Sequence, residues 1–131
     1  MKVVINSCFG GFGLSHEAVM EWARRKGFPL YAFIEFESHF VPYKPGDRVM
    51  LIHYSKSALT KEGKYRKEDY FLESGIERTD PDLVAVVEEL GDSANGDCAN
   101  LEIVEIPDGV EWTIEEYDGY ESIHEKHRRW P

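Results

Sequence analysis

Three closely spaced glycines near the N-terminus form the first candidate for a binding site. Residues 3–5 are Val-Val-Ile and predict a buried strand, and Ser15 is a favourable helix N-cap, so residues 6–15 connect a strand to a helix. Unpaired N–H groups at a helix start bind anions, and glycine lets a ligand approach the backbone closely. The predicted ligand contacts in this turn are Ser7, Cys8, Gly10, Gly11, Gly13 and Ser15.

The spacing of these glycines does not identify a known phosphate-binding motif. The turn lacks the GKS or GKT ending of a P-loop, and it does not follow the GxGxxG pattern of dinucleotide-binding folds. An alternative interpretation stays open, in which the glycines only supply backbone angles that other residues avoid.

Three side chains are candidates for chemistry on a ligand held in this turn. Cys8 lies close to the predicted helix start, where a thiol can act as a nucleophile, and His16 and His53 are candidates for acid–base steps. The sequence identifies no base for Cys8, and a buried, inert cysteine is the alternative.

Aromatic and basic residues suggest the class of ligand. Phe9 and Phe12 flank the glycines, and Lys61, Lys64 and Arg66 belong to a basic middle segment. Aromatic faces suit a nucleobase and cations suit its phosphate, so the pattern favours a nucleotide-type small molecule. In this hypothesis Phe9 or Phe12 covers the base and the basic side chains close over the phosphate.

Carboxylates and histidines near the C-terminus are the candidates for a metal site or an acid–base pair. His124 and His127 share a helix face if this stretch is helical, but no CxxC or HExxH accompanies them, and no metal is predicted. The carboxylates are Glu115, Glu116, Asp118 and Glu121. Strand alternation puts Glu115 and Glu116 on opposite faces, which favours a solvated acidic edge.

The elements that must position these residues follow from hydrophobic periodicity and turn signals. One predicted helix follows Ser15 and a second follows Thr79 or Asp80, with Pro81 in its first turn. The polar, basic stretch 55–67 is predicted to be a mobile loop that an anion would order. The predicted strands cover residues 2–6, 30–36, 48–54, 69–72, 101–106 and 110–116.

The last two predicted strands alternate strictly and are joined by Pro107-Asp108-Gly109, so they predict an antiparallel hairpin with Trp112 facing inward. A short helix is expected after Asp118-Gly119. The fold class predicted from this order is α/β, with a mixed sheet of about five strands, two main helices and a C-terminal hairpin; α+β is the alternative. At 131 residues the chain is expected to form a single domain, residues 1–131.

Charge and hydropathy exclude some classes of function. The formal net charge of −10 argues against general nucleic-acid binding. Residues 80–125 hold fifteen acidic residues and no Lys or Arg, whereas residues 44–67 hold seven basic residues and two acidic ones. No apolar run approaches the roughly 18 residues of a membrane span, and no export signal is evident, so a cytoplasmic protein with reduced cysteines is expected.

Three segments, VINSCFGGFGLS, DPDLVAVVEELG and EIPDGVEWTIEEYDGYESIHEKHRRW, resemble small proteins encoded by tailed bacteriophages. The resemblance extends over nearly the whole chain and carries no catalytic motif. It implies a protein that acts in the cytoplasm of an infected bacterium, as an accessory factor directed at the host.

These observations leave three hypotheses. The first is a phage accessory protein that binds a phosphorylated, nucleotide-type molecule and so sequesters a host signal. The second is an enzyme acting on the same class of ligand. The third is an interaction module whose acidic segment inhibits a host protein. No cofactor is predicted, and a homo-oligomer is left open.

Overall fold

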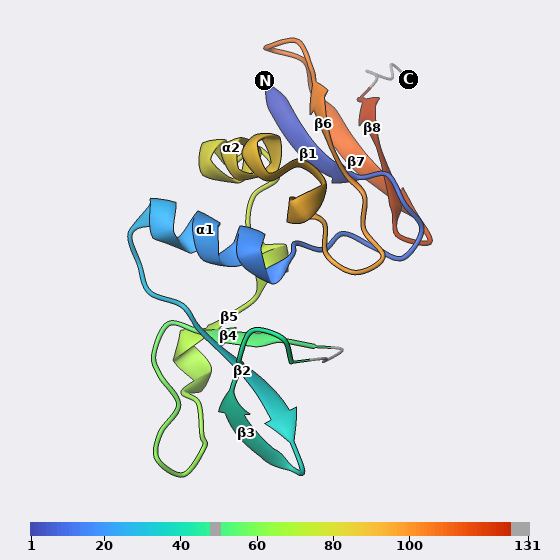
Figure 1. Ribbon diagram of the computed structural model, residues 1–131. Coiled ribbons are helices and arrows are strands. Elements are labelled where there is room, and N and C mark those ends of the chain that lie inside the picture. Colours follow the sequence, from blue (N-terminus) through green and yellow to red (C-terminus); the bar gives the residue numbers. More distant parts are fainter. Residues whose placement is uncertain (48–50, 127–131) are drawn as a thin grey trace, which may run out of the picture.

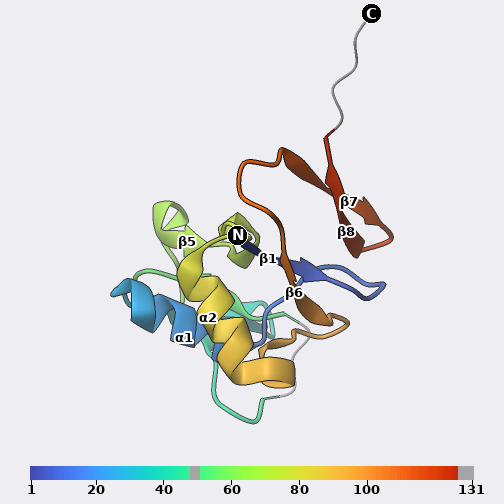
Figure 2. The ribbon, with the colours of Figure 1, turned by 90° about the horizontal axis from the view of Figure 1, so that it is seen from above.

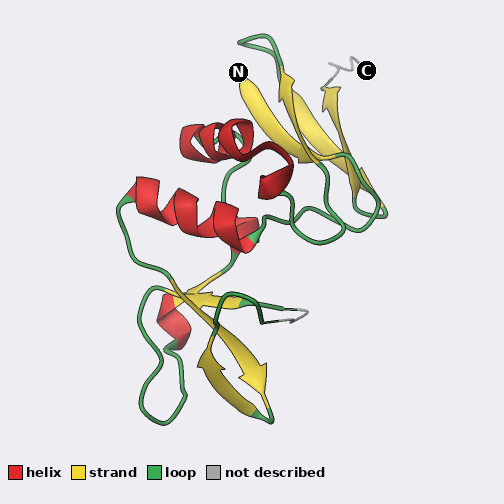
Figure 3. Cartoon of the chain, in the orientation of Figure 1, coloured by secondary structure: helices red, strands yellow, loops and turns green. Residues whose placement is uncertain are grey.

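The computed structural model describes residues 1–47 and 51–126, which form two α-helices and eight strands in three small antiparallel sheets (Figures 1 and 3). This arrangement is of the α+β kind. In chain order the elements are β1 (Lys2–Asn6), α1 (His16–Lys26), β2 (Tyr31–Phe36), β3 (His39–Pro42), β4 (His53–Ser55), β5 (Tyr70–Phe71), α2 (Pro81–Leu90), β6 (Leu101–Glu105), β7 (Trp112–Tyr117) and β8 (Tyr120–Glu125), with 3-10 turns at Lys67–Asp69, Glu73–Gly75 and Gly91–Ala94.

Local capping sets the start of both helices, as predicted. The Ser15 hydroxyl accepts the N–H of Ala18 at the start of α1, and Gly27 ends this helix in the left-handed conformation with φ of 85°. The Asp80 carboxylate accepts two N–H groups in the first turn of α2, where Pro81 has no N–H to leave unpaired. Both helix predictions are therefore confirmed.

The predicted mixed sheet of about five strands is wrong. A mixed sheet needs at least one parallel strand pair, which a strand returning parallel to β1 after α1 would supply. The chain instead leads from α1 into β2, which belongs to a separate sheet of order β3-β2-β4-β5, and β1 pairs antiparallel with β6. In Figure 1 the β2–β5 sheet lies below the helices, and β1, β6, β7 and β8 lie at the upper right, beside α2.

The C-terminal hairpin exists but uses different strands from those predicted. β6 pairs with β1, and β7 pairs with β8, a strand where a short helix was expected. Asp118 and Gly119 both adopt positive φ, 49° and 87°, and such a two-residue turn matches the natural twist of a hairpin. The Asp-Gly signal at this turn therefore prevails over the longer Pro107-Asp108-Gly109 connection.

The sheet below the helices contains one strand that the sequence did not reveal. β3 follows β2 through Glu37 and Ser38, which both have positive φ, 48° and 68°. Residues other than Gly, Asn and Asp rarely occupy such a turn, so no sequence signal marks this one. The strand predicted over 48–54 is shorter in the structure and begins at His53; residues 48–50 lie outside the described residues.

The core lies between the helices and the two flanking sheets. Figure 2 shows α2 between α1 and the β1–β6 pair, and the apolar face of α2 is buried there. Residues from β1, α1, β4 and α2 belong to one continuous apolar cluster, so the β1–β6 pair and the β2–β5 sheet are joined through the helices. No helix among residues 1–47 and 51–126 is long and apolar enough to cross a membrane.

Replacing Leu83 by alanine should strongly destabilise the protein. The Leu83 side chain is 0% exposed in α2, and truncating a buried leucine costs about 2–5 kcal/mol. Leu72→Ala is the matched control, because Leu72 is 61% exposed and should cost less than about 0.5 kcal/mol. Urea unfolding of both variants measures the difference, and equal midpoints would contradict the placement of α2 in the core.

Candidate functional site

A cleft of about 440 Å³ lies beside the glycine turn and the start of α1. Its other walls come from the segment between β3 and β4, from Glu73 and from the loop after α2. The described residues that line it are Gly10, Gly11, Phe12, Gly13, Leu14, Ser15, His16, Tyr43, Asp47, Leu51, Ile52, Tyr54, Glu73, Asn95, Gly96 and Asp97.

Glu73 is a partly buried carboxylate in the cleft. Its carboxylate accepts the N–H of Leu14 at 3.2 Å, immediately before the helix cap. Burial raises the pKa of Glu73 above its ordinary value, because the charged form loses solvation. A partly buried carboxylate with a raised pKa in a cleft is typical of functional sites. Part of the anion-binding capacity of this helix start is therefore used by the protein's own carboxylate.

Three aromatic rings form a second wall of the cleft. His16 stacks on Tyr54, with ring centroids 5.7 Å apart and planes inclined by 13°, and Tyr43 meets His16 edge-on at 4.8 Å. His16 Nδ1 and the Tyr54 hydroxyl form a hydrogen bond of 2.9 Å. Burial lowers the pKa of His16 and raises the pKa of Tyr54, so both groups are neutral at physiological pH.

The cleft is acidic. Asp47, Glu73 and Asp97 line it, and no Lys or Arg is among its described lining residues. The local potential is therefore negative unless a ligand brings positive charge or hydrogen-bond donors.

The structure brings together only part of the predicted site. Gly10, Gly11, Phe12, Gly13 and Ser15 line the cleft, together with His16. The remaining predicted contacts are not among its lining residues: Ser7, Cys8, Phe9, Lys61, Lys64 and Arg66.

The basic side chains belong to the loop between β4 and the 3-10 turn at Lys67–Asp69, on the lower part of the molecule in Figure 1. Tyr65 anchors this loop by stacking on Phe33 at 5.4 Å. Gly63 packs so closely on the backbone of Phe40 that an added Cβ would lie 2.9 Å from the Phe40 carbonyl oxygen. The sequence analysis identified neither anchor. The predicted mobility of this loop stays a prediction.

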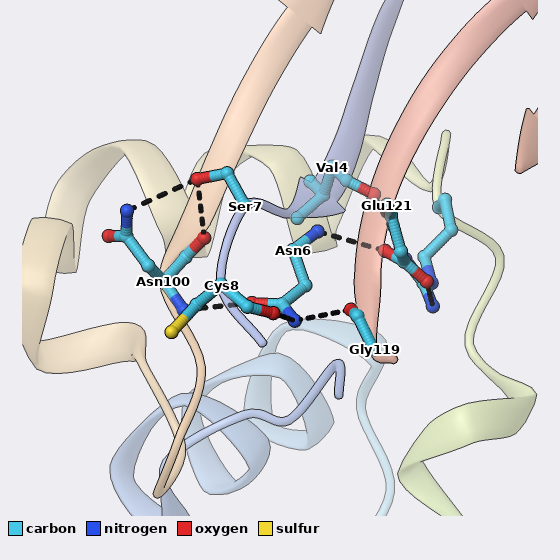
Figure 4. Close-up of polar contacts among 8 residues, drawn as sticks. Val4, Asn6, Ser7, Cys8, Asn100, Gly119 and Glu121 are labelled. Atoms are coloured by element: carbon cyan, nitrogen blue, oxygen red, sulfur yellow. Dashed lines mark hydrogen bonds and ion pairs between the residues drawn. The ribbon is translucent and has the colours of Figure 1, made fainter. Parts of the chain in front are cut away.

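The end of β1 is held by the fully buried side chain of Asn6 (Figure 4). Its amide nitrogen donates to the carbonyls of Cys8 and Gly119, both at 2.7 Å, and its amide oxygen accepts the N–H of Asn100 at 2.9 Å. One side chain thus joins the glycine turn to the β7–β8 turn and to the start of β6. Ser7 and Cys8 lie in this junction rather than in the cleft.

A buried ion pair reinforces the same junction. Arg78 donates to both carboxylate oxygens of Glu121, at 2.6 and 2.9 Å, and Glu121 also accepts the N–H of Asn6 at 2.8 Å. The Arg78 guanidinium lies over the Phe12 ring, 3.5 Å from its centroid. Because Arg78 covers one face of Phe12, only the other face is available to a ligand.

Close packing explains some glycines of the turn but not all of them. A Cβ on Gly10 would lie 2.7 Å from the Cβ of Cys98, and Gly10 also has a φ of 125°. A Cβ on Gly119 would collide with the backbone of Gly11. Gly13, in contrast, has no positive φ, and the nearest atom to an added Cβ is 3.9 Å away. The alternative in which the glycines serve only the backbone conformation therefore explains Gly10. Gly13, in contrast, has room for a side chain.

The other candidate residues are separated from the cleft. His53 stacks on Phe33 and contacts the Tyr70 hydroxyl at 2.7 Å, in the β2–β5 sheet. His124 contacts Glu115 at 3.2 Å, and His127 lies outside the described residues. Within residues 1–47 and 51–126, no three His, Cys, Asp or Glu side chains are grouped to hold a metal ion.

The sequence analysis missed Glu73 and Tyr43, as well as the role of Asn6. Glu73 is 59 residues from its partner Leu14, and no motif or periodicity connects the two positions. Asn6 was predicted only as the last residue of a strand. A buried asparagine at a strand end carries no local signal, because its partners come from distant turns.

Removing the Asn6 side chain should destabilise the fold. Asn6→Ala leaves two carbonyls and one N–H without partners in a buried junction, at an expected cost of about 3 kcal/mol or more. Asn100→Ala is the control, because the Asn100 side chain makes one exposed bond to the Ser7 hydroxyl and should cost less than about 1 kcal/mol. Thermal unfolding compares the two variants; equal losses would argue against a central role for Asn6.

Comparisons with known proteins identify no relative from which a function can be transferred. No family model matches the chain, and no curated protein or solved structure matches it. The resemblance to phage proteins therefore stays a prediction, and the function must be argued from the cleft itself.

Proposed function

We propose that the cleft binds a small nucleotide-type molecule, with the base beside Glu73 and the aromatic wall and the phosphate side at the glycine turn. The observation that carries this proposal is the presence, in one cleft, of a half-buried carboxylate and a glycine turn with free donors. Among the described residues, the N–H groups of Phe12 and Gly13 have no hydrogen-bond partner, whereas the Gly11 nitrogen is covered by Gly119. The cleft volume lies in the range of about 300–1,000 Å³ that is typical of small-molecule sites.

Glu73 favours one kind of base. Each carboxylate oxygen has two lone pairs, so the bond from Leu14 leaves acceptor capacity for a ligand. A base with two adjacent N–H donors, such as guanine, can pair with a carboxylate through two parallel hydrogen bonds. Adenine presents no such pair of adjacent donors, and a guanine-type base is therefore the preferred ligand.

The acidic lining limits the phosphate charge. Asp47 and Asp97 repel a triphosphate, and the basic loop that would have neutralised it is not part of the cleft. A nucleoside or a monophosphate suits the site better. On the resemblance to phage proteins, binding without turnover would sequester a host signalling nucleotide.

An enzyme acting on the same ligand is the second candidate, favoured by the His16–Tyr54 pair. A neutral imidazole in a cleft can accept a proton, and Tyr54 orients it through the 2.9 Å hydrogen bond. Of the three residues predicted for catalysis, only His16 lines the cleft. Incubation with guanine and adenine nucleosides and nucleotides, followed by chromatography, separates turnover from simple binding.

Gly13→Val should block the cleft while leaving the fold intact. Position 13 has an ordinary backbone conformation and space for a Cβ, so the melting temperature should stay close to that of the wild type. Affinity for guanosine monophosphate, measured by calorimetry, should fall at least tenfold, or about 1.4 kcal/mol. Gly10→Val is the contrasting variant, because its clash with Cys98 and its positive φ should destabilise the protein. A folded Gly13→Val variant with wild-type affinity would place the site elsewhere.

Binding should weaken at acidic pH. Only the ionised Glu73 carboxylate accepts two donors, so affinity should fall as Glu73 becomes protonated. Because burial raises the pKa of Glu73, this fall should begin at a higher pH than for a glutamate with the ordinary pKa of about 4.3. Glu73→Gln should lower the affinity at about pH 8 and remove this pH dependence. Glu62→Gln, an exposed change in the basic loop, should preserve both the affinity and its pH dependence. A wild-type affinity for guanosine, which carries no titrating phosphate, that does not vary between about pH 8 and pH 4 would rule out pairing with Glu73.

A further inference from the structure

Three exposed aromatic side chains gather where the glycine turn meets the β7–β8 turn. Phe9 is 62% exposed, Tyr117 74% and Tyr120 42%. The Phe9 ring contacts both tyrosines, with centroids 6.5 Å from Tyr117 and 5.4 Å from Tyr120. We call these three residues the hairpin patch. None of them lines the cleft, so the patch is a separate surface.

The hairpin patch is held in place by the backbone around it. Tyr117 and Tyr120 are cross-strand partners at the last register position of the hairpin, on either side of the Asp118-Gly119 turn. The Gly10 N–H donates to the Asp118 carbonyl at 3.0 Å and fixes the turn that carries Phe9. In Figure 1 the loop after β1 and the tip of the β7–β8 hairpin lie together at the right of the molecule. The aromatic surface is therefore preformed.

Acidic side chains lie next to the hairpin patch. The β7–β8 register puts Glu115 on the same face as Tyr117, and Asp118 is exposed in the turn itself. Glu116 is also exposed, but at the neighbouring position of β7 it lies on the opposite face from Tyr117. Residues 80–125 contain no Lys or Arg. Arg78 is nearby but is largely buried and paired with Glu121, so it does not neutralise the surface.

We propose that the hairpin patch docks a segment of a partner protein that carries arginine or lysine. Aromatic faces attract cationic side chains, and carboxylates at their edge complete the pairing. Tyrosine, phenylalanine and arginine are enriched at protein interfaces. A second copy of this chain fits less well, because symmetric contact would bring the acidic rims together on proteins of net charge −10.

The test uses a synthetic 12-residue peptide of alternating arginine and serine, titrated into the full chain at low ionic strength. The matched variants are Tyr117→Ser in the hairpin patch and Phe36→Ser at an exposed aromatic residue at the end of β2. Neither variant changes the net charge, so a difference between them reports the aromatic contact alone. Thermal unfolding of both variants confirms that the fold is retained.

We expect Tyr117→Ser to weaken peptide binding about tenfold and Phe36→Ser to leave it unchanged. Amide chemical-shift changes in the wild type should centre on Phe9, Tyr117 and Tyr120. Equal affinities of the two variants would overturn the proposal and indicate general attraction to the acidic surface. Absence of any peptide binding would also overturn it. So would a dimer that forms with increasing concentration in the wild type and is lost in Tyr117→Ser, because the patch would then bind a second copy.

Discussion

The buried hydrogen bonds of Asn6 are the constraint on which the arrangement of β1, β6, β7 and β8 depends. A single amide side chain satisfies backbone groups of Cys8, Gly119 and Asn100, and the Asn6 N–H is bound by Glu121. Without Asn6, three chain segments would meet in an apolar interior with unpaired polar groups, which is costly. The ion pair between Glu121 and Arg78 belongs to the same junction, and Arg78 also lies over the Phe12 ring. The fold thus fixes the glycine turn through polar contacts rather than through apolar packing alone.

This junction divides the glycine turn into two functional halves. Ser7 and Cys8 contact the start of β6 and the junction, Gly10 contacts Asp118 and Cys98 and also lines the cleft, and Gly11 to Gly13 border the cleft. The helix start contributes to the cleft as expected, but Glu73 already occupies one of its donors. The cleft is therefore better suited to a ligand with N–H donors and little negative charge than to a polyphosphate. The hairpin patch lies on the engaged half, where Phe9 is turned away from the cleft toward the two tyrosines.

Some of the acidic residues in the range 80–125 are paired with cations from other parts of the chain once the protein is folded. Several carboxylates in this range pair with cations from elsewhere in the chain: Glu88 with Lys2, Glu89 with Arg25, Asp80 and Asp82 with Lys26, and Glu121 with Arg78. Most of these pairs are exposed and contribute little stability individually. They do, however, neutralise the face formed by α1 and α2. Glu115, Glu116 and Asp118, on the hairpin and its turn near the exposed aromatic rings, have no Lys or Arg partner among the described residues.

The sequence by itself determined the elements whose signals are local. The Ser15 and Asp80 caps, the apolar face of α2 and the apolar run of β1 all act within a few residues, and each element forms where it was predicted.

The tertiary structure alone decided which strands pair. The same alternating segments can pair as β6 with β7 or, as the fold has them, as β1 with β6 and β7 with β8. The turn at Asp118-Gly119 and the burial of β1 against α2 select the second arrangement. The cleft was equally out of reach, because Glu73 and Leu14 are 59 residues apart, and so was the junction, because Asn6 and Glu121 are 115 residues apart. Contacts at such separations depend on the packing of the whole chain, and no local spacing of residues encodes them.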